Sequence, residues 1–460
     1  MMLSQLSHIV NGRCTGPDVA FDSVSIDTRT LSSGALFVAL KGPNFDGHDY
    51  VSVARDKGAS AAMVSSLIND SLPAVTVGDT RIALGQLAAS WRAGFDLPLL
   101  AVTGSNGKTT VKEMLSSILI QACDGEKDRV LSTIGNLNND LGLPLTLLRL
   151  RDQHRYAVAE MGMNNPGELS YLTRIARPDV AVITNAAAAH LQGLQSIEGV
   201  ARAKAEIFSG VKAGGTAIIN DDDDYATLWR ELAGDLQITG FSLQQESDVT
   251  AEFDLYKDHS RVFLKTPWGE ASCQLALPGQ HNVANALAAT AAAGSVGISL
   301  ADIVAGLETW RGVAGRLQSK MINGLHIIDD TYNANPASIK AALEVLVMQP
   351  GRKIFVMGDM GELGEDSSLL HKQAGELAAE LGVDSCYTLG EQSVYAAEAF
   401  SRQAPSRQAQ SFSAPDALLI ALAKELRANS DRPINILVKG SRALKMEHII
   451  EQLDESGVRD

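Results

Sequence analysis

The chain has 460 residues, of which 45% are hydrophobic and 20% charged, and its formal net charge is −15. At roughly 100–200 residues per domain, this length and ordinary globular composition predict two to four domains. The acidic balance argues against nucleic acid or an anionic membrane as a partner, because both attract basic surfaces.

The cysteines and the N-terminal residues indicate a cytoplasmic protein. Cys14, Cys123, Cys273 and Cys386 form no C-x-x-C pair, which predicts reduced thiols rather than a disulfide or metal framework. The first residues have neither a basic start nor a long apolar run, so we expect no signal peptide. No stretch reaches about 18 uninterrupted apolar residues, so we expect no membrane insertion.

Three α/β sections follow one another along the chain. Residues 1–96 carry short apolar runs broken by glycines, which predict a small α/β domain. Residues 97–312 alternate strands with helices and predict a parallel sheet covered on both faces, with an antiparallel patch at 248–276. The acidic run 221–224 is interpreted as a solvated turn. Residues 313–460 alternate again and predict a second, Rossmann-like doubly wound sheet.

The stretch "AVTGSNGKTT" joins the first central strand to a helix. It departs from the phosphate-loop pattern G-x-x-x-x-G-K-[ST], since Val102 stands five places before Gly107, where a glycine is expected. Gly104 and Gly107 still let backbone N–H groups approach an anion at a helix N-terminus. Lys108 can reach the β- and γ-phosphates, and the Thr109 hydroxyl can bind Mg²⁺. We therefore predict an ATP site, the alternative being a glycine-rich turn without a ligand.

Two candidate metal ligands follow later strands. Glu160 ends the strand "YAVAE", at the sheet edge where open α/β proteins bind ligands, and Mg²⁺ requires such hard oxygen donors. His190 follows the next strand in "NAAAAHLQG". The alternatives are a solvated glutamate and a structural histidine.

Together these motifs resemble the Mur ligases, the ATP-dependent amide ligases of peptidoglycan precursor synthesis. The loop of that family has the compact form Gly104-Ser105-Asn106-Gly107-Lys108-Thr109-Thr110. The motifs that resemble its central ATPase domain are "GNLNNDLGLP", "AEMGM", "HLQG", "ARAKAEIF" and the adenine-binding helix "GQHNVANALAA". The motifs that resemble its C-terminal domain are "GR", "DDTYNANP" and "KGSRALKME". The N-terminal "SIDTRTLSSGALFVALKG" and "FDGHDY" resemble its uridine-nucleotide site.

The motifs also separate members of that family. "DDTYNANPASIKAAL" and "GDMGELGEDS" look like the member that adds D-alanyl-D-alanine to UDP-MurNAc-tripeptide, and the D-N-P-R motif of the diaminopimelate- or lysine-adding member is absent. Ala188 stands where a proline is expected, a small departure that touches no catalytic role. The resemblance implies a ligase that turns ATP, UDP-MurNAc-tripeptide and D-Ala-D-Ala into ADP, phosphate and UDP-MurNAc-pentapeptide. The third residue of the tripeptide, diaminopimelate or lysine, stays open.

The implied reaction passes through an acyl phosphate, because a carboxylate is a poor electrophile until it is phosphorylated. Two Mg²⁺ ions would neutralise charge on the transferring phosphoryl group, and Lys108 would stabilise the same charge. By resemblance, Thr109 and Glu160 hold one metal, and Glu160, His190 and a carbamylated Lys204 hold the other. The carbamate would form when a neutral lysine amine captures CO₂.

The resemblance assigns further residues to the two nucleotides. Asn285 would bind adenine, Asp330 would accept hydrogen bonds from the ribose, and Arg316 would reach the phosphates when the third domain closes. The residues that would line the UDP site are Ser25, Asp27, Arg29 and His48.

Two other functions remain open on the sequence alone. A folylpolyglutamate synthase-like ligase shares the central fold and chemistry, but it has no reason to carry the N-terminal "DTR…DGHDY" section. A nucleotide switch or other non-catalytic P-loop protein would not need "NANP" and "KGSR" on a third domain. We expect a monomer.

Overall fold

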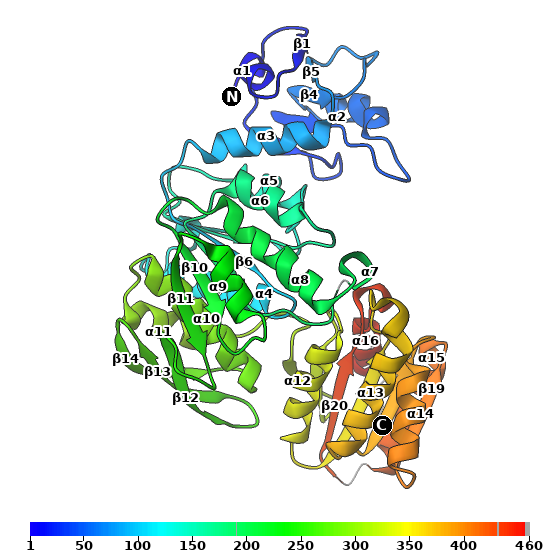
Figure 1. The fold of residues 1–460 in the computed structure, drawn as a ribbon. Coiled ribbons are helices and arrows are strands. Elements are labelled where there is room, and N and C mark those ends of the chain that lie inside the picture. Colours follow the sequence, from blue (N-terminus) through cyan, green and yellow to red (C-terminus); the bar gives the residue numbers. More distant parts are fainter. Residues whose placement is uncertain (190, 430–431, 456–460) are drawn as a thin grey trace.

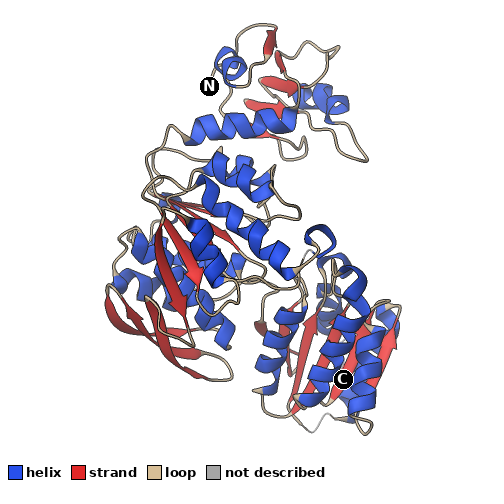
Figure 2. Cartoon of the chain, viewed as in Figure 1, coloured by secondary structure: helices blue, strands red, loops and turns tan. Residues whose placement is uncertain are grey.

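The computed structural model describes residues 1–189, 191–429 and 432–455, which form three separate sheets in chain order (Figure 1). The N-terminal and C-terminal sheets lie at opposite ends of the molecule, with the central one between them. Helices cover the faces of the central and C-terminal sheets (Figure 2). The prediction of three α/β domains is confirmed. The boundaries after residues 96 and 312 stay a prediction.

The N-terminal sheet has five strands in the order β1-β5-β4-β3-β2, with β1 antiparallel to the rest. Its strands are β1 (Arg13–Thr15), β2 (Ser23–Ser25), β3 (Ala35–Val38), β4 (Ala61–Val64) and β5 (Ala74–Thr76). Its helices are α1 (Leu3–Ile9), α2 (Val51–Asp56) and α3 (Thr80–Arg92).

Helix α3 connects this section to the central one. Asp79 starts the helix, since its carboxylate accepts the N–H groups of Arg81 and Ile82. At the other end the buried guanidinium of Arg92 donates to three backbone carbonyls, those of Phe95, Leu97 and Ala176. These bonds fasten the end of α3 to the central section.

The central sheet has nine strands in the order β14-β13-β12-β11-β10-β9-β6-β8-β7. Its parallel strands are β6 (Leu99–Thr103), β7 (Val130–Ser132), β8 (Tyr156–Glu160), β9 (Val180–Ile183), β10 (Thr216–Asn220) and β11 (Gln237–Ser242). The antiparallel patch is confirmed as β12 (Val249–Leu255), β13 (Ser260–Thr266) and β14 (Gly269–Leu275). Its helices are α4 (Lys108–Gln121), α5 (Gly142–Leu147), α6 (Glu168–Ala176), α7 (Leu191–Leu194), α8 (Ile197–Ala205), α9 (Ala226–Ala233), α10 (Gln280–Ser295) and α11 (Leu300–Thr309).

Strand β6 is buried on both faces, as its continuous apolar run requires. Leu100 and Val102 pack into the core beneath α4 and α10, whereas Leu99 and Ala101 pack into the opposite core beside α6 and α8. Alternate residues of a strand face opposite sides of a sheet, so one short strand stabilises both layers. This fixes the end of β6, where the glycine loop begins.

The C-terminal sheet has six strands in the order β15-β16-β20-β17-β18-β19. Its strands are β15 (Gln318–Ile322), β16 (Leu325–Asp330), β17 (Arg352–Gly358), β18 (Ser385–Leu389), β19 (Gln408–Phe412) and β20 (Ile434–Lys439). Its helices are α12 (Pro336–Val347), α13 (Ser367–Glu380), α14 (Val394–Gln403), α15 (Pro415–Ala428) and α16 (Glu447–Glu455). Because β16 and β20 pair in parallel, Asp330 stands opposite Lys439 at their carboxyl ends. Across the described parts of the chain, every helix is too short or too polar to span a bilayer.

Candidate active site

The loop between β6 and α4 adopts a conformation that only glycine permits at two positions. Gly104 has φ 154°, and a Cβ there would stand 1.7 Å from the Thr184 hydroxyl oxygen. Gly107 is left-handed with φ 81°, and its Cβ would stand 2.3 Å from Oδ1 of Asn285. The close approaches to the end of β9 and to α10 require glycine only at Gly104 and Gly107. The loop therefore does not need the additional glycine of the common pattern, at the position of Val102.

The first turn of α4 presents an anion site. Within the described residues we find no protein acceptor for the backbone N–H groups of Lys108, Thr109 and Thr110. The first N–H groups of a helix carry partial positive charge and have no partner inside the helix. Gly107, the residue before the turn, and Lys108 and Thr110 within it line the adjoining cavity. The turn is thus ready to receive phosphate oxygens.

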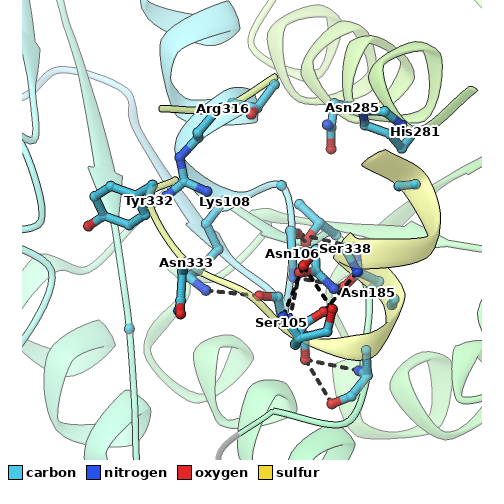
Figure 3. A pocket seen from close by; sticks show the side chains of 18 of the residues that line it. Ser105, Asn106, Lys108, Asn185, His281, Asn285, Arg316, Tyr332, Asn333 and Ser338 are labelled. Atoms are coloured by element: carbon cyan, nitrogen blue, oxygen red, sulfur yellow. Dashed lines mark hydrogen bonds between the residues drawn. The ribbon is translucent and has the colours of Figure 1, made fainter. Parts of the chain in front are cut away.

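Ser105 and Asn106 are used to hold the loop. The N–H of Ser105 donates to the Asn185 carbonyl, and the N–H of Asn106 donates to Oδ1 of Asn185, both at 2.9 Å. The Ser105 hydroxyl accepts the N–H of Ala187 at 2.9 Å. Asn335, from the C-terminal domain, donates its amide to Oδ1 of Asn106 at 2.7 Å. Both loop residues line the cavity, but these bonds occupy their side chains (Figure 3).

Lys108 folds back over its own loop. Its Nζ donates to the Gly104 carbonyl at 2.6 Å. Burial lowers the pKa of the Lys108 ammonium, while the Glu160 carboxylate acts in the opposite direction. An ammonium held only by backbone carbonyls can exchange them for phosphate oxygens, which are stronger acceptors.

Two predicted metal ligands lie in direct contact. The Thr109 hydroxyl donates to Oε2 of Glu160 at 2.8 Å, and Glu160 is 2% exposed. Asn138 donates its amide to the other carboxylate oxygen, also at 2.8 Å, and the Thr133 hydroxyl accepts the N–H of Glu160 at 3.0 Å. This oriented pair of hard oxygens fits a magnesium ion.

Lys204 is buried near this centre, at 2% exposure on α8. Burial lowers the pKa of its amine well below the ordinary lysine value; the charge of Lys108 adds to this shift and Asp223 opposes it. Among the described residues no hydrogen bond to the amine is found. His190 lies outside the described residues. Within residues 1–189, 191–429 and 432–455 no cluster of three or more His, Cys, Asp or Glu residues suited to a metal is present.

Asn285 and His281 form the far end of the site on α10 (Figure 3). Asn285 lines the cavity, and its amide lies against the loop at Gly107. His281, which the sequence analysis did not single out, lines the same end; its Nε2 is buried without a partner, and burial lowers its pKa to about 4. Asn282 instead donates to the Pro278 carbonyl at 2.8 Å, a structural bond.

The C-terminal domain supplies the opposite wall. Asp330 accepts a hydrogen bond from the buried ammonium of Lys439 at 2.5 Å and from the N–H of Leu317 at 3.2 Å. Arg316 crosses to the central domain, where it donates to the Thr109 hydroxyl at 2.9 Å. Its guanidinium carbon lies 4.3 Å from the centre of the Tyr332 ring. Lys439 and Tyr332 were missed, although both lie inside quoted motifs.

The glycine loop, Glu160, Asn285, Arg316 and Asp330 line one cavity of about 600 Å³ between the central and C-terminal domains. His281, Asn138 and Asn164 also line it. This volume suits a nucleotide-sized ligand.

The predicted uridine residues lie in the N-terminal domain and bond mainly to one another. Arg29 pairs with Asp27 at 2.7 Å, which with the Arg29 N–H bond holds the pKa of Asp27 near 2. The Ser25 hydroxyl donates to the Asp27 carbonyl at 3.0 Å. His48 is held through both ring nitrogens, Nδ1 by Asp46 at 2.5 Å and Nε2 by the N–H of Ser65 at 2.9 Å.

The acidic run 221–224 forms the expected turn, but Asp221, Asp222 and Asp223 are partly buried and hydrogen-bonded rather than solvated. Asp222 accepts the Ser242 hydroxyl and the N–H of Leu243, at 2.5 and 2.7 Å. Asp223 accepts the N–H of Ala186 at 2.8 Å and thereby supports the segment that holds the glycine loop. Carboxylates are strong acceptors for turn N–H groups, which explains their position here.

Known proteins resemble this chain along almost its whole length. Three family descriptions match: "Mur ligase family, catalytic domain" over residues 20–92, "Mur ligase middle domain" over 102–293 and "Mur ligase, glutamate ligase domain" over 315–442. The UDP-N-acetylmuramoyl-tripeptide–D-alanyl-D-alanine ligase of Escherichia coli K12 is 43% identical over 458 residues, covering 99% of this chain and 98% of the relative. The enzyme of that name from Bacillus subtilis 168 is 34% identical over 99% and 98%.

Solved structures agree with these relatives. MurF from Acinetobacter baumannii has a TM-score of 0.93 at 39% identity, with 98% of each chain covered. MurF ligase from Thermotoga maritima, in complex with ADP, has a TM-score of 0.81 at 26% identity, over 95% and 97%. Folylpolyglutamate synthase from Mycobacterium tuberculosis, at 18% identity and a TM-score of 0.64, shares the fold alone. The chain, whose glycine loop, Glu160 and third-domain Arg316 line one cavity, belongs to the Mur ligase family.

Proposed function

We propose that this enzyme joins D-alanyl-D-alanine to UDP-MurNAc-tripeptide at the expense of ATP, giving UDP-MurNAc-pentapeptide for peptidoglycan synthesis. The observation that carries the proposal is that Arg316 of the third domain lines the same cavity as the phosphate loop and donates a hydrogen bond to Thr109 of that loop. A nucleotide switch has no need of such a wall. The relatives that bear this activity as their name match nearly the whole chain, including its N-terminal section.

The loop and the third domain together bind and orient the ATP phosphates. The free N–H groups at the start of α4 bind phosphate oxygens, and Lys108 leaves the Gly104 carbonyl to stabilise charge on the transferring phosphoryl group. Thr109 and Glu160 hold a magnesium ion, which when bound supplies Lewis-acid neutralisation of the phosphates. Arg316 moves from Thr109 to the same phosphates. Closure of the third domain over the bound substrates would exclude water from the acyl phosphate.

We propose two magnesium ions and a carbamylated Lys204. A cationic lysine next to the metal site would repel the ions and has no lone pair to offer. The buried amine of Lys204, with its lowered pKa, has the neutral form that attacks CO₂. The resulting carbamate is an anionic oxygen donor, and with Glu160 and His190 it completes the second site.

The remaining residues bind the nucleotides. Asn285 recognises adenine. Asp330 accepts hydrogen bonds from the ribose hydroxyls, and the ammonium of Lys439 holds the Asp330 carboxylate in place. The phosphates contact the whole loop, that is Gly104, Ser105, Asn106, Gly107, Lys108, Thr109 and Thr110. The UDP part of the substrate contacts Ser25, Asp27, Arg29 and His48.

We further propose that the domains span residues 1–96, 97–312 and 313–460, that the enzyme is a monomer, and that it is located in the cytoplasm.

An omission assay tests this function. Purified enzyme with ATP and Mg²⁺ should release ADP only when both UDP-MurNAc-tripeptide and D-Ala-D-Ala are present, and mass spectrometry should find the pentapeptide. ADP release without the uridine substrate would favour a simple ATPase. ADP release driven by a folate and glutamate would favour the folylpolyglutamate synthase-like alternative. A mixture of lysine- and diaminopimelate-containing tripeptides in the same assay identifies the third residue.

A further inference from the structure

Two guanidinium groups gather around one tyrosine at the C-terminal side of the cavity. The guanidinium carbons of Arg316 and Arg442 lie 4.3 and 5.8 Å from the centre of the Tyr332 ring. Tyr332 follows β16 and Arg442 follows β20, and these strands end side by side because they pair in parallel. Each cation is attracted by the ring, but the two repel each other. An anion between or beside them would stabilise the arrangement.

Arg442 keeps most of its donors for a ligand. Its NH1 donates to Oε1 of Glu447 at 2.7 Å, and among the described residues no other hydrogen bond of the Arg442 side chain is found. Its side chain is 57% exposed. Glu447 therefore orients the guanidinium while Nε and NH2 stay available, and that edge matches the two oxygens of a carboxylate.

The chemistry of the acceptor calls for such a group. D-Ala-D-Ala carries its reacting amine at one end and a carboxylate at the other. The amine must reach the acyl phosphate, which forms beside Lys108 and Thr109. Two extended residues span about 7 Å, so the carboxylate must be held close to the phosphate loop. Arg316 contacts Thr109 directly, so it lies at the end of the site where the acyl phosphate forms. Tyr332 lies next to Arg316, and Arg442 lies next to Tyr332, which places Arg442 one side chain farther from the reacting atoms.

The other cations of this wall are already engaged. Lys439 is buried against Asp330 and also donates to the Asn333 carbonyl at 2.9 Å. Arg316 is directed at Thr109 and, in the proposed reaction, at the phosphates. Arg442 is thus the cation next to Tyr332 whose charge the ATP site does not use.

We propose that the Nε–NH2 edge of Arg442 binds the terminal carboxylate of the acceptor dipeptide, with the Tyr332 ring as its platform. The proposal rests on the proposed function and adds a residue that selects the acceptor. It makes a free carboxyl end a requirement, so the enzyme discriminates against dipeptides that end in an amide.

Comparison of D-Ala-D-Ala with its C-terminal carboxamide tests this assignment. In the wild type, kcat/KM for the acid should exceed that for the amide by about tenfold to hundredfold, the range of a charge-assisted pair. Arg442→Ala should lose this preference by slowing the acid alone, with the KM values for ATP and UDP-MurNAc-tripeptide unchanged. Arg442→Gln, which can still bond Glu447, should behave in the same way.

Arg402→Ala is the matched control, since Arg402 is an exposed arginine on α14 paired with Glu398 at 3.0 Å, and it should keep the full preference. Equal use of acid and amide by the wild type would overturn the assignment. So would an Arg442→Ala enzyme that slows both acceptors equally. Absence of product with either dipeptide would instead defeat the proposed function itself, a result that the wild type alone reveals.

Discussion

The phosphate loop and the N-terminal uridine motif were both identified from short sequence patterns, yet they are built differently. In the loop, the groups proposed to bind phosphate are backbone N–H groups, and the side chains of Asn185 and Ser105 hold the backbone in place. In the uridine motif the groups proposed to bind substrate are side chains, and Asp27 and Arg29 pair with each other. On that proposal the first site is preorganised, whereas the second would have to exchange its own ion pair for substrate contacts.

The largest effect should come from Lys108→Ala. Removal of a charge that acts on the transferring phosphoryl group should lower kcat by about 10²–10³-fold. The fold should survive, because the ammonium contacts only carbonyls of its own loop. Steady-state kinetics with circular dichroism measure both. Lys424→Ala, an exposed lysine on α15, is the control, and an unchanged kcat in Lys108→Ala would contradict the preorganised loop.

Lys204→Ala should follow, with about a hundredfold loss of kcat, the scale of losing a group that supports a metal site. Short carboxylic acids should partly restore the rate, since they replace the anionic oxygens of a carbamate, and they should not affect the wild type. Rescue by small amines would show that Lys204 works as a cation. The measurement is kcat against added acetate or ethylamine.

Asn285→Ala should act on binding more than on chemistry. Adenine lies far from the reacting phosphate, so the KM for ATP should rise about tenfold with little change in kcat. Asn282→Ala on the same helix is the matched control: its bond to the Pro278 carbonyl predicts lower thermal stability with an unchanged KM. If Asn285→Ala loses stability rather than ATP affinity, its role is structural.

Arg29→Ala tests the proposed uridine site of the N-terminal domain. The ion pair with Asp27 is exposed and its net free energy small, so the KM for UDP-MurNAc-tripeptide should rise only about two- to fivefold, at constant kcat. Arg55→Ala, which removes another arginine of the same domain that pairs with the exposed Asp56 and with Asp70, should leave KM unaltered. A hundredfold rise would mean that Arg29 is as preorganised as the phosphate loop.

The two regions also hold histidines of opposite character. His48 has partners at both nitrogens, whereas His281 is buried with Nε2 unpaired and its pKa lowered to about 4. Unfolded histidine binds its proton near pH 6.5, above the folded value, so the unfolded state takes up protons first. Stability should therefore fall by about 2 kcal/mol as the pH drops from 6.5 to 4. His281→Asn should flatten that part of the curve in chemical denaturation.

The sequence predicted the features that are local in the chain and missed those that join distant segments. The strand, loop and helix around Gly107 follow one another directly in the sequence. The short alternating pattern at 248–276 can likewise be recognised from neighbouring residues alone, and it predicted the antiparallel strands. In contrast, Lys439 and Asp330 form a hydrogen bond although they are 109 positions apart in the sequence, and Asn138 and Glu160 do so although they are 22 positions apart. Such pairs depend on which strands become neighbours. The turn at 221–224 was predicted, but the bonds of its carboxylates were not, for the same reason: the partners Ala186 and Ser242 lie in other segments of the chain.

The Thr109 hydroxyl has a consequence for the order of events. It donates to Glu160 and accepts from Arg316, so protein groups already fill two of its bonding positions. A magnesium ion needs a lone pair of the same oxygen. One lone pair of the hydroxyl stays free for the ion, but the Arg316 guanidinium, 2.9 Å from the same oxygen, would repel a cation bound there. In the proposed reaction, loading of the metal nucleotide would therefore move the arginine from the hydroxyl to the phosphates, and the measured nucleotide affinity would include the free energy of that movement.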